Sequence, residues 1–334
     1  MAYDPVLTFT ERGIYCPAGD FFIDPWKPVD RALITHAHSD HARAGHRTYL
    51  ATEGTAPVLR HRLGDISLET VRYGARTRIG STHVSFHPAG HVPGSAQIRV
   101  ERAGEVWVVS GDYKIEADGL SEPFEPLRCD AFISECTFGL PVFHWRPQTE
   151  IAEDMNLWWQ HAVNEGKTPI LCAYSLGKAQ RVLRLLNPEI GPILTHGAVE
   201  TTTQILREQG YQLPPTTAVT SETDPKAVPN AILIAPPSAA GGNWAKQFRP
   251  FSTGFASGWM QLRGIRRRRA MDRGFAVSDH ADWRGLNSAI RETGAEKIFV
   301  THGYTEIFSR WLQEQGYDAR VVSTDFTGDL ADAE

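Results

Sequence analysis

Short apolar runs that end abruptly in polar residues dominate the first third of the chain, and this pattern predicts β-strands. Residues 66–86 alternate between apolar and polar positions, as expected for strands with one buried face. Residues 43–63 hold small and basic residues and are expected to be helical. The other runs predicted to be strands occupy residues 6–9, 13–16, 21–24 and 32–34. The amino-terminal part is therefore predicted to be rich in β-sheet.

The middle of the chain changes to alternating helix and strand patterns. Residues 147–166 carry an apolar stripe at helical spacing, formed by Ile151, Met155, Trp158, Trp159 and Ala162. We interpret its two tryptophans as core residues rather than as platforms for stacked bases. Strands are then expected at residues 168–174, 192–195 and 231–235, with helices at 175–186, where Ser175 is the expected N-cap, and at 201–210. This alternation predicts a small α/β domain with a parallel sheet.

The composition is that of an ordinary globular protein. Of the 334 residues, 41% are apolar and 22% are charged, and the formal net charge is −5. This charge argues against nucleic-acid binding by the whole surface but leaves a local basic groove open. The first residues lack the basic and apolar regions of a signal peptide, and no apolar run approaches membrane-spanning length. The four scattered cysteines are expected to be reduced thiols in a cytoplasmic protein.

Four side chains that can bind metals follow the apolar run at residues 32–34. They are His36, His38, Asp40 and His41, all within six residues. Imidazole and carboxylate groups are ligands for borderline divalent ions such as Zn²⁺. A single histidine is more often a hydrogen-bonded or surface residue, but crowding four such groups together without a metal is costly. The cluster therefore predicts a metal site.

Further polar residues stand at the ends of later apolar runs. His91 lies between glycines after a predicted strand, and glycine lets the backbone approach a metal closely. The other residues in such positions are Asp24, Asp112, Glu135, His280 and His302. His83 and His87 alternate with apolar residues, and we assign them to structure.

These motifs resemble those of a known family. His-x-His-x-Asp-His is the hallmark of the metallo-β-lactamase fold, and Ser-Gly-Asp112 after a strand resembles its metal-bridging carboxylate. The segments around Glu135, His280 and His302 resemble three successive motifs of its β-CASP group, and residues 173–180 resemble a recurrent segment of that group's inserted domain. The resemblance implies an α/β fold, a metallo-β-lactamase αββα sandwich with an inserted α/β β-CASP domain. The expected parts are residues 1–147 and 263–334 for the sandwich and 148–262 for the insertion.

The resemblance also implies the roles of individual residues. One metal ion is expected on His36, His38 and His91, and a second on Asp40, His41 and His302, with Asp112 bridging the two. The cofactors are then two divalent ions, with zinc favoured and manganese as the alternative. His280 is the expected general acid, oriented by Glu135. Asp24 either starts a turn or supports the metal ligands through outer hydrogen bonds.

Substrate contacts are less strongly indicated. Ser278 and Lys114 are candidates to hold a phosphate oxygen, although a structural role is the simpler interpretation for each. Arg266 and Arg267 belong to an arginine-rich run that either contacts phosphates or forms a solvated face.

The implied activity is metal-dependent phosphodiester hydrolysis, in which a pair of ions activates water for attack on phosphorus. The motifs are most similar to those of the bacterial ligase-associated DNA exonucleases, which implies a DNA repair nuclease acting with DNA ligase and helicase. The alternative is an RNA-processing β-CASP ribonuclease similar to the mRNA 3′-end processing factors. A thioester or lactone hydrolase would not need the inserted domain, and a non-catalytic subunit would not need every ligand. The polarity of digestion, exonuclease or endonuclease action, the native metal and the oligomeric state stay open.

Overall fold

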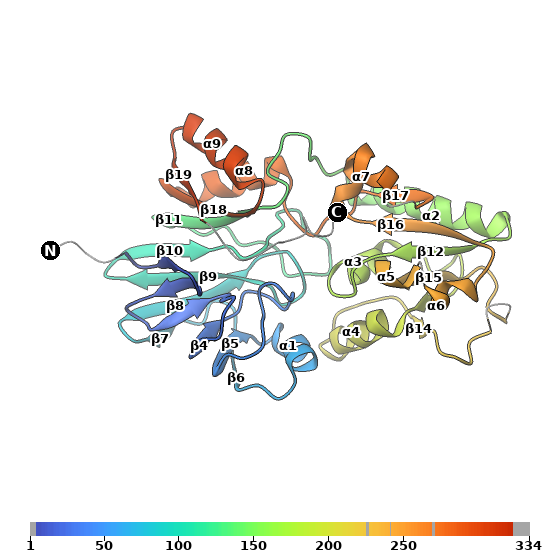
Figure 1. The fold of residues 1–334 in the computed structure, drawn as a ribbon, viewed down its shortest axis with the longest axis horizontal. Coiled ribbons are helices and arrows are strands. Elements are labelled where there is room, and N and C mark those ends of the chain that lie inside the picture. Colours follow the sequence, from blue (N-terminus) through green and yellow to red (C-terminus); the bar gives the residue numbers. More distant parts are fainter. Residues whose placement is uncertain (1–4, 225–226, 241, 269–270, 323–334) are drawn as a thin grey trace. The chain divides into compact units, whose positions relative to one another are not determined.

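The structure, a computed structural model, describes residues 5–224, 227–240, 242–268 and 271–322, without the side chains of residues 266–268 (Figure 1). The chain divides into two compact units. Unit 1 comprises Met1–His144 and His280–Glu334, and unit 2 comprises Trp145–Asp279. The chain thus leaves unit 1, forms unit 2 and returns to unit 1.

The first sheet of unit 1 has six strands in sequence order. The two hairpin pairs at its start are antiparallel, and the remaining pairs are parallel. The short helix α1 (Ala56–Leu63) follows the fifth strand. The strands are β1 (Thr8–Thr10), β2 (Gly13–Cys16), β3 (Phe21–Ile23), β4 (Arg31–Leu33), β5 (Thr48–Thr52) and β6 (Leu68–Val71).

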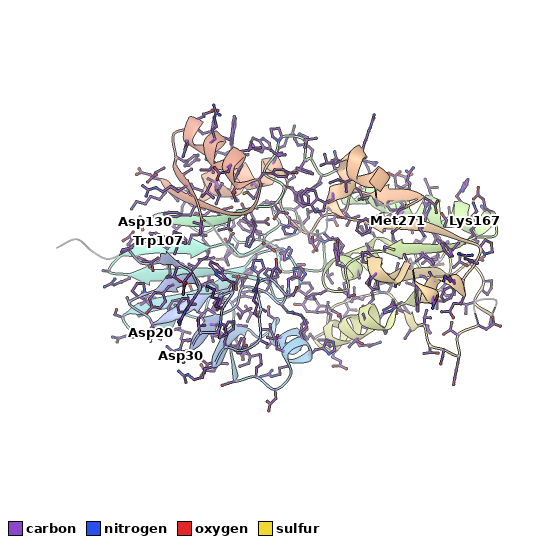
Figure 2. The ribbon with its side chains drawn as sticks, viewed as in Figure 1. Asp20, Asp30, Trp107, Asp130, Lys167 and Met271 are labelled. Atoms are coloured by element: carbon purple, nitrogen blue, oxygen red, sulfur yellow. The ribbon has the colours of Figure 1, made fainter. Side chains whose placement is uncertain are left out.

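The second sheet of unit 1 has seven strands in the order β19-β18-β11-β10-β9-β8-β7. Parallel pairing of β11 with both β10 and β18 brings strands from the two ends of the chain together. Trp107 and Asp130, labelled in Figure 2, lie at the same end of this sheet, where Asp130 accepts a hydrogen bond from the backbone of Val106. The strands are β7 (Thr77–Ile79), β8 (Thr82–Pro88), β9 (Ala96–Arg102), β10 (Glu105–Val109), β11 (Ala131–Cys136), β18 (Lys297–Gly303) and β19 (Asp318–Val321).

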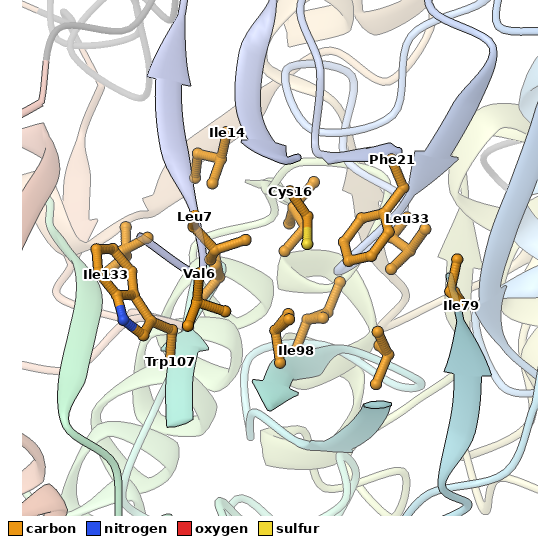
Figure 3. Close-up of a cluster of buried hydrophobic side chains, with 14 of the residues drawn as sticks. Val6, Leu7, Ile14, Cys16, Phe21, Leu33, Ile79, Ile98, Trp107 and Ile133 are labelled. Carbon is orange, nitrogen blue, oxygen red and sulfur yellow. The ribbon is translucent and has the colours of Figure 1, made fainter. Parts of the chain in front are cut away.

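Apolar side chains from both sheets form one buried cluster (Figure 3). Phe21 and Leu33 come from the first sheet, and Ile98 and Trp107 come from the second. The opposite face of the second sheet packs in another cluster with α8 (Trp283–Thr293) and α9 (Thr305–Glu314), which supply residues such as Leu286. Each large apolar side chain buried in this way contributes about 1.5–3 kcal/mol. The second sheet, which carries several of the candidate site residues, is thus covered on both faces.

Unit 2 contains a six-stranded sheet in which every pair is parallel, in the order β14-β13-β15-β12-β16-β17. Trp159 is fully buried in its core, as the helical stripe predicted, and Trp158 packs against the same cluster. The strands are β12 (Thr168–Cys172), β13 (Ile193–Thr195), β14 (Thr217–Ala218), β15 (Ile232–Ala235), β16 (Phe251–Ala256) and β17 (Arg273–Phe275). The helices are α2 (Gln148–Asn164), α3 (Lys178–Leu185), α4 (Gly197–Glu208), α5 (Pro237–Ala240), α6 (Asn243–Lys246), η2 (Gly258–Gln261) and α7 (Arg263–Arg268).

Several local predictions differ from the structure. Residues 43–63 are not one helix, because Thr48–Thr52 pairs as β5 with β4 and β6 before α1 begins. Ser175 is not the N-cap of α3. Gly177 is, and its backbone N–H is bound by the side chain of Gln180.

Two further observations concern boundaries. Unit 2 continues past residue 262 to Asp279, because β17 pairs with β16. The acidic residues from Asp325 onward, a composition typical of a frayed end, lie outside the described residues. Among the described helices, none is both long and apolar enough to cross a membrane.

Candidate metal centre

The predicted ligands follow the ends of strands in unit 1. His36 comes three residues after β4, and Asp112 comes three residues after β10. His302 lies near the end of β18, and His91 lies in the connection from β8 to β9. A backbone hydrogen bond from Ala96 to the carbonyl of Thr35 ties that connection to the loop of the His cluster. Six separate segments therefore supply the site, since Glu135 on β11 and His280 also reach it.

One group of four side chains converges closely. His36, His38, His91 and Asp112 each offer a ligand atom, and these atoms lie within 4.8 Å of one another. Nδ1 of His38 is 3.1 Å from Nε2 of both His36 and His91. Tetrahedral coordination with bonds of about 2.0–2.1 Å would place ligand nitrogens roughly 3.3 Å apart. The donor set and its spacing therefore fit a divalent ion of zinc type.

A second group shares the same carboxylate. His41, His302 and Asp112 also offer atoms within 4.8 Å of one another, and Nε2 of His41 is 3.3 Å from Oδ2 of Asp112. Asp112 is thus common to both groups, as a bridging residue would be. Asp40 lies 3.7 Å from Nε2 of His41 but belongs to neither close group of the described residues.

Asp24 lies behind the ligands rather than among them. Its carboxylate accepts hydrogen bonds from the backbone N–H and the hydroxyl of Thr35, and it lies 2.7 Å from Nδ1 of His41. Since a carboxylate only accepts, Nδ1 of His41 carries the proton and Nε2 is left to face Asp112. Asp24 also has a backbone φ of 42°, a strained value for a non-glycine residue.

Two threonines that the sequence interpretation missed set the tautomers of two more histidines. The hydroxyl of Thr35 donates to Asp24, so its contact of 3.1 Å with His36 is a hydrogen bond donated by Nδ1 of His36. The hydroxyl of Thr301 donates to the carbonyl of Ser134 and accepts from Nδ1 of His302 in the same way. Both threonines immediately precede their histidine at a strand end, and this repeated Thr-His pair was the signal available in the sequence.

The charges of the site favour a bound cation. Burial lowers the pKa of His36 well below its ordinary value, so its imidazole is neutral and able to bind a metal. Burial also tends to lower the pKa of His41, but the carboxylates of Asp112 and Asp40 outweigh it and raise that pKa well above its ordinary value. Burial tends to raise the pKa of Asp112, but its histidine neighbours, His41 first, lower it well below the usual range. Asp112 is therefore an ionised carboxylate surrounded by imidazoles.

His280 and Glu135 form a buried pair next to this cluster. Nδ1 of His280 lies 2.9 and 3.0 Å from the two carboxylate oxygens of Glu135. The same carboxylate accepts hydrogen bonds from the backbone N–H groups of Tyr113 and Thr137, which fix its orientation. The rings of His280 and His91 are 4.6 Å apart. Glu135 therefore holds Nδ1 as the donor, and proton exchange with a substrate would take place at Nε2.

Glycine is required beside two of the candidate ligands. At Gly90, with φ of 75°, a Cβ atom would lie 2.1 Å from the carbonyl oxygen of Lys114. At Gly111, with φ of 57°, a Cβ atom would lie 2.7 Å from the side chain of Thr35. Only glycine permits these close approaches without strain.

Two of the predicted substrate contacts have other partners in the structure, and the side chains of the other two lie outside the described residues. Lys114 is buried and forms an ion pair of 2.9 Å with Glu116. Ser278 belongs to unit 2, where its carbonyl accepts a hydrogen bond from Arg181. The side chains of Arg266 and Arg267 lie outside the described residues. The phosphate-contact roles of all four stay predictions.

Comparison with known proteins adds independent information. No family model matches the chain. It is 29% identical to a protein named probable DNA ligase from Opitutus terrae, over 94% of this chain and 31% of that protein. It is also 29% identical to ribonuclease TTHA0252 from Thermus thermophilus, over 50% of this chain and 44% of that protein. The endoribonuclease YSH1 of Mycosarcoma maydis is 28% identical over 54% of this chain and 26% of its own length.

The similarity to these relatives and the resemblance of the ordered His and Asp motifs lead to the same group of proteins. The chain is similar to these proteins along its length, and this similarity supports its resemblance to the β-CASP group of the metallo-β-lactamase family. It spans less than half the length of each of these relatives. A crystal structure of a protein of unknown function from Enterococcus faecalis matches it in fold, with a TM-score of 0.63 at 11% identity over 88% of this chain and 79% of that one.

Proposed function

We propose that the chain is a metal-dependent phosphodiesterase that acts on nucleic acid, and specifically a DNA exonuclease with a role in DNA repair. The observation that carries the proposal is the convergence of His36, His38, His91, His41 and His302 on the carboxylate of Asp112. That donor set suits two divalent ions of zinc type, with manganese as the alternative. Asp40 is proposed as a further ligand beside His41.

The proposed fold assignment follows the same family. Unit 1 would be the αββα sandwich, and unit 2 would be the inserted β-CASP domain. The parallel α/β sheet of unit 2 and the continuation of unit 1 on both sides of it support this assignment.

The chemistry can be assigned to named residues. When bound, the two ions would activate water and neutralise charge on a phosphodiester. His280 would give a proton from Nε2 to the departing alkoxide, because Glu135 keeps its Nδ1 as a hydrogen-bond donor. Asp24, Thr35 and Thr301 would orient the ligand histidines and present their Nε2 atoms to the ions.

DNA is the proposed substrate because of how the relatives align. The protein named probable DNA ligase matches 94% of the chain, whereas the two ribonucleases match only about half of it. A segment similar to this chain is thus part of a protein named as a DNA ligase. This supports the proposal that the chain acts alongside a DNA ligase. The association with a helicase and the cytoplasmic location stay predictions. The names of the ribonuclease relatives keep RNA processing as the second candidate.

The test is digestion of end-labelled single-stranded DNA and of RNA with the matched sequence, each with Zn²⁺, Mn²⁺ or Mg²⁺. The proposal predicts stepwise shortening of DNA at a rate at least tenfold above that of RNA. Faster cleavage of RNA would establish the second candidate, and absence of cleavage by fully metallated protein would contradict both.

A further inference from the structure

Unit 2 contains a cavity of about 290 Å³ that is separate from the residues of the metal centre. Its walls come from the start of α2, from η2 and α7, and from β17, the strand at one edge of the sheet (Figure 1). Ile151, Met260 and Phe275 supply apolar wall, and Arg146, Arg263 and Arg273 supply guanidinium groups. The volume is close to the lower end of the range for ligand sites, roughly 300 Å³.

The charges of these arginines are only partly balanced. Arg146 is held by Glu150 at 3.0 Å and by Asp154 at 2.7 Å, and both carboxylates stand on α2. Arg263 and Arg273 are exposed, and neither has an ion-pair partner among the described residues. Asp154 is the one acidic residue among the described residues that line the cavity. The cavity therefore has an excess of positive charge.

Arg273 is held in place without losing its hydrogen-bonding capacity. Its guanidinium lies over the ring of Phe275, 5.8 Å from the ring centroid. Stacking uses the face of the guanidinium plane and leaves the N–H groups at its edge directed outward. This arrangement reduces the entropy lost when those N–H groups bind an anion.

We propose that this cavity binds a phosphate group of a nucleic-acid chain, through Arg263 and Arg273. Arginine forks match phosphate oxygens in two-point hydrogen bonding, and they keep their charge at every physiological pH. A cation would be repelled by the guanidinium groups of Arg263 and Arg273, which no described carboxylate balances. The inference rests on the proposed function, which makes nucleic acid the ligand. A nuclease that holds its substrate at the metals would gain affinity from a second phosphate contact in this cavity. The phosphate is either an internal phosphodiester or a terminal phosphate, and both present the same oxygens.

The chain offers a matched control in Arg249. This residue is also an exposed arginine of unit 2, and its guanidinium also lies over the ring of a phenylalanine two residues later, 5.9 Å from the centroid of Phe251. It does not line the cavity. Arg249→Gln and Arg273→Gln therefore make the same chemical change in the same local arrangement, and they differ in whether the cavity loses a charge.

The experiment measures binding of the full chain to a fluorescein-labelled single-stranded oligodeoxynucleotide by fluorescence anisotropy. All proteins carry Asp112→Asn so that the probe is not cleaved. The R263Q/R273Q double variant should bind at least tenfold more weakly, and the slope of log affinity against log salt should become less steep by about 0.7, the value for one phosphate contact on a single strand. Arg249→Gln should leave affinity and slope unchanged. Equal effects of Arg249→Gln and Arg273→Gln, or an unchanged slope in the double variant, would overturn the inference.

Two further measurements distinguish a terminal from an internal phosphate, and a failure of the phosphate site from a failure of the proposed activity. Loss of affinity confined to a 5′-phosphorylated probe would assign the cavity to a terminal phosphate, and equal loss with a 5′-hydroxyl probe would assign it to an internal one. If the otherwise unsubstituted chain cleaves nothing but the arginine-dependent binding persists, the proposed activity fails and the phosphate site stands. If the chain cleaves DNA while the double variant binds normally, the phosphate site fails and the activity stands.

Discussion

Both units bury several charged side chains, but they balance these charges in opposite ways. In unit 2 the carboxylate of Asp279 pairs with Lys178 while both side chains are almost fully buried, and Glu200 pairs with Arg207 at 3.2 Å. In unit 1 the buried carboxylates of Asp24, Asp112 and Glu135 have no lysine or arginine partner among the described residues. Their partners are histidines, hydroxyls and backbone N–H groups.

The difference indicates in which unit the protein's own side chains compensate the buried charges. A buried carboxylate opposite a lysine is compensated by the charge of that lysine. A carboxylate whose partners are histidines can be compensated by a divalent cation, which takes the place of the protons that those histidines carry. We therefore expect the ion pairs of unit 2 to contribute stability, and the cluster of carboxylates and imidazoles in unit 1 to hold metal.

The largest expected effect comes from removing the shared carboxylate of that centre. Asp112→Ala should lower the rate of phosphodiester hydrolysis at least about 10³-fold, the scale of several kcal/mol of charge stabilisation. Elemental analysis of the same sample should show loss of at least one metal equivalent. Full activity in Asp112→Ala would mean that the cluster only stabilises the fold, as the ion pairs of unit 2 are expected to do.

Removing the proposed proton donor should give a different defect. His280→Ala should keep the metal content of the unsubstituted chain but lose roughly 10²–10⁴-fold in turnover of DNA. A leaving group of low pKa needs no proton, so an activated aryl phosphodiester should recover much of the lost rate. Loss of metal in His280→Ala would place this histidine among the ligands.

Breaking the ion pair of Lys178 with Asp279 in unit 2 should lower stability. Lys178→Met leaves Asp279 buried without its cation, which should cost about 3–5 kcal/mol of unfolding free energy. Metal content should be unchanged under conditions where the variant is folded. Lys167→Met is the control (Figure 2), because Lys167 pairs with Glu165 on the surface and its loss should leave Tm unchanged. Equal Tm values for the two variants would contradict the comparison.

A smaller effect is expected at Glu200. Burial tends to raise the pKa of Glu200, but hydrogen bonds from Thr195, Thr216 and Gln204 and the charge of Arg207 lower it below 4.5. A lowered folded-state pKa adds stability that is present above pH 4.5 and is lost as pH falls through the folded value. Glu200→Gln should cost about 1–3 kcal/mol near neutral pH and much less at low pH. Urea unfolding at several pH values checks this, and a pH-independent cost would show that the charge is irrelevant.

The sequence predicted the parts of the molecule that depend on local pattern. The helix at Gln148–Asn164 and the strand at Ile232–Ala235 agree with their apolar spacing, and the ligands predicted from the ordered motifs, except Asp40, belong to the close groups of unit 1. The strand Thr48–Thr52 was missed because its place depends on pairing with distant strands, which outweighs local propensity.

In the site, too, local sequence pattern predicted some features and tertiary contacts decided others. Asp24 was found because it ends a strand, but the tautomer control by Thr35 and Thr301 required the actual distances to His36 and His302. The cavity with Arg263 and Arg273 joins segments that are far from Arg146 in sequence, and no motif marks it.

The central claim is that unit 1 holds two metal ions on its histidine and aspartate cluster. The most direct test is elemental analysis of the purified chain after saturation with Zn²⁺ or Mn²⁺ and removal of unbound metal. We predict about two equivalents of metal for each chain, and the same value for Lys178→Met. A chain that is folded by circular dichroism yet retains no metal after this treatment would contradict the claim.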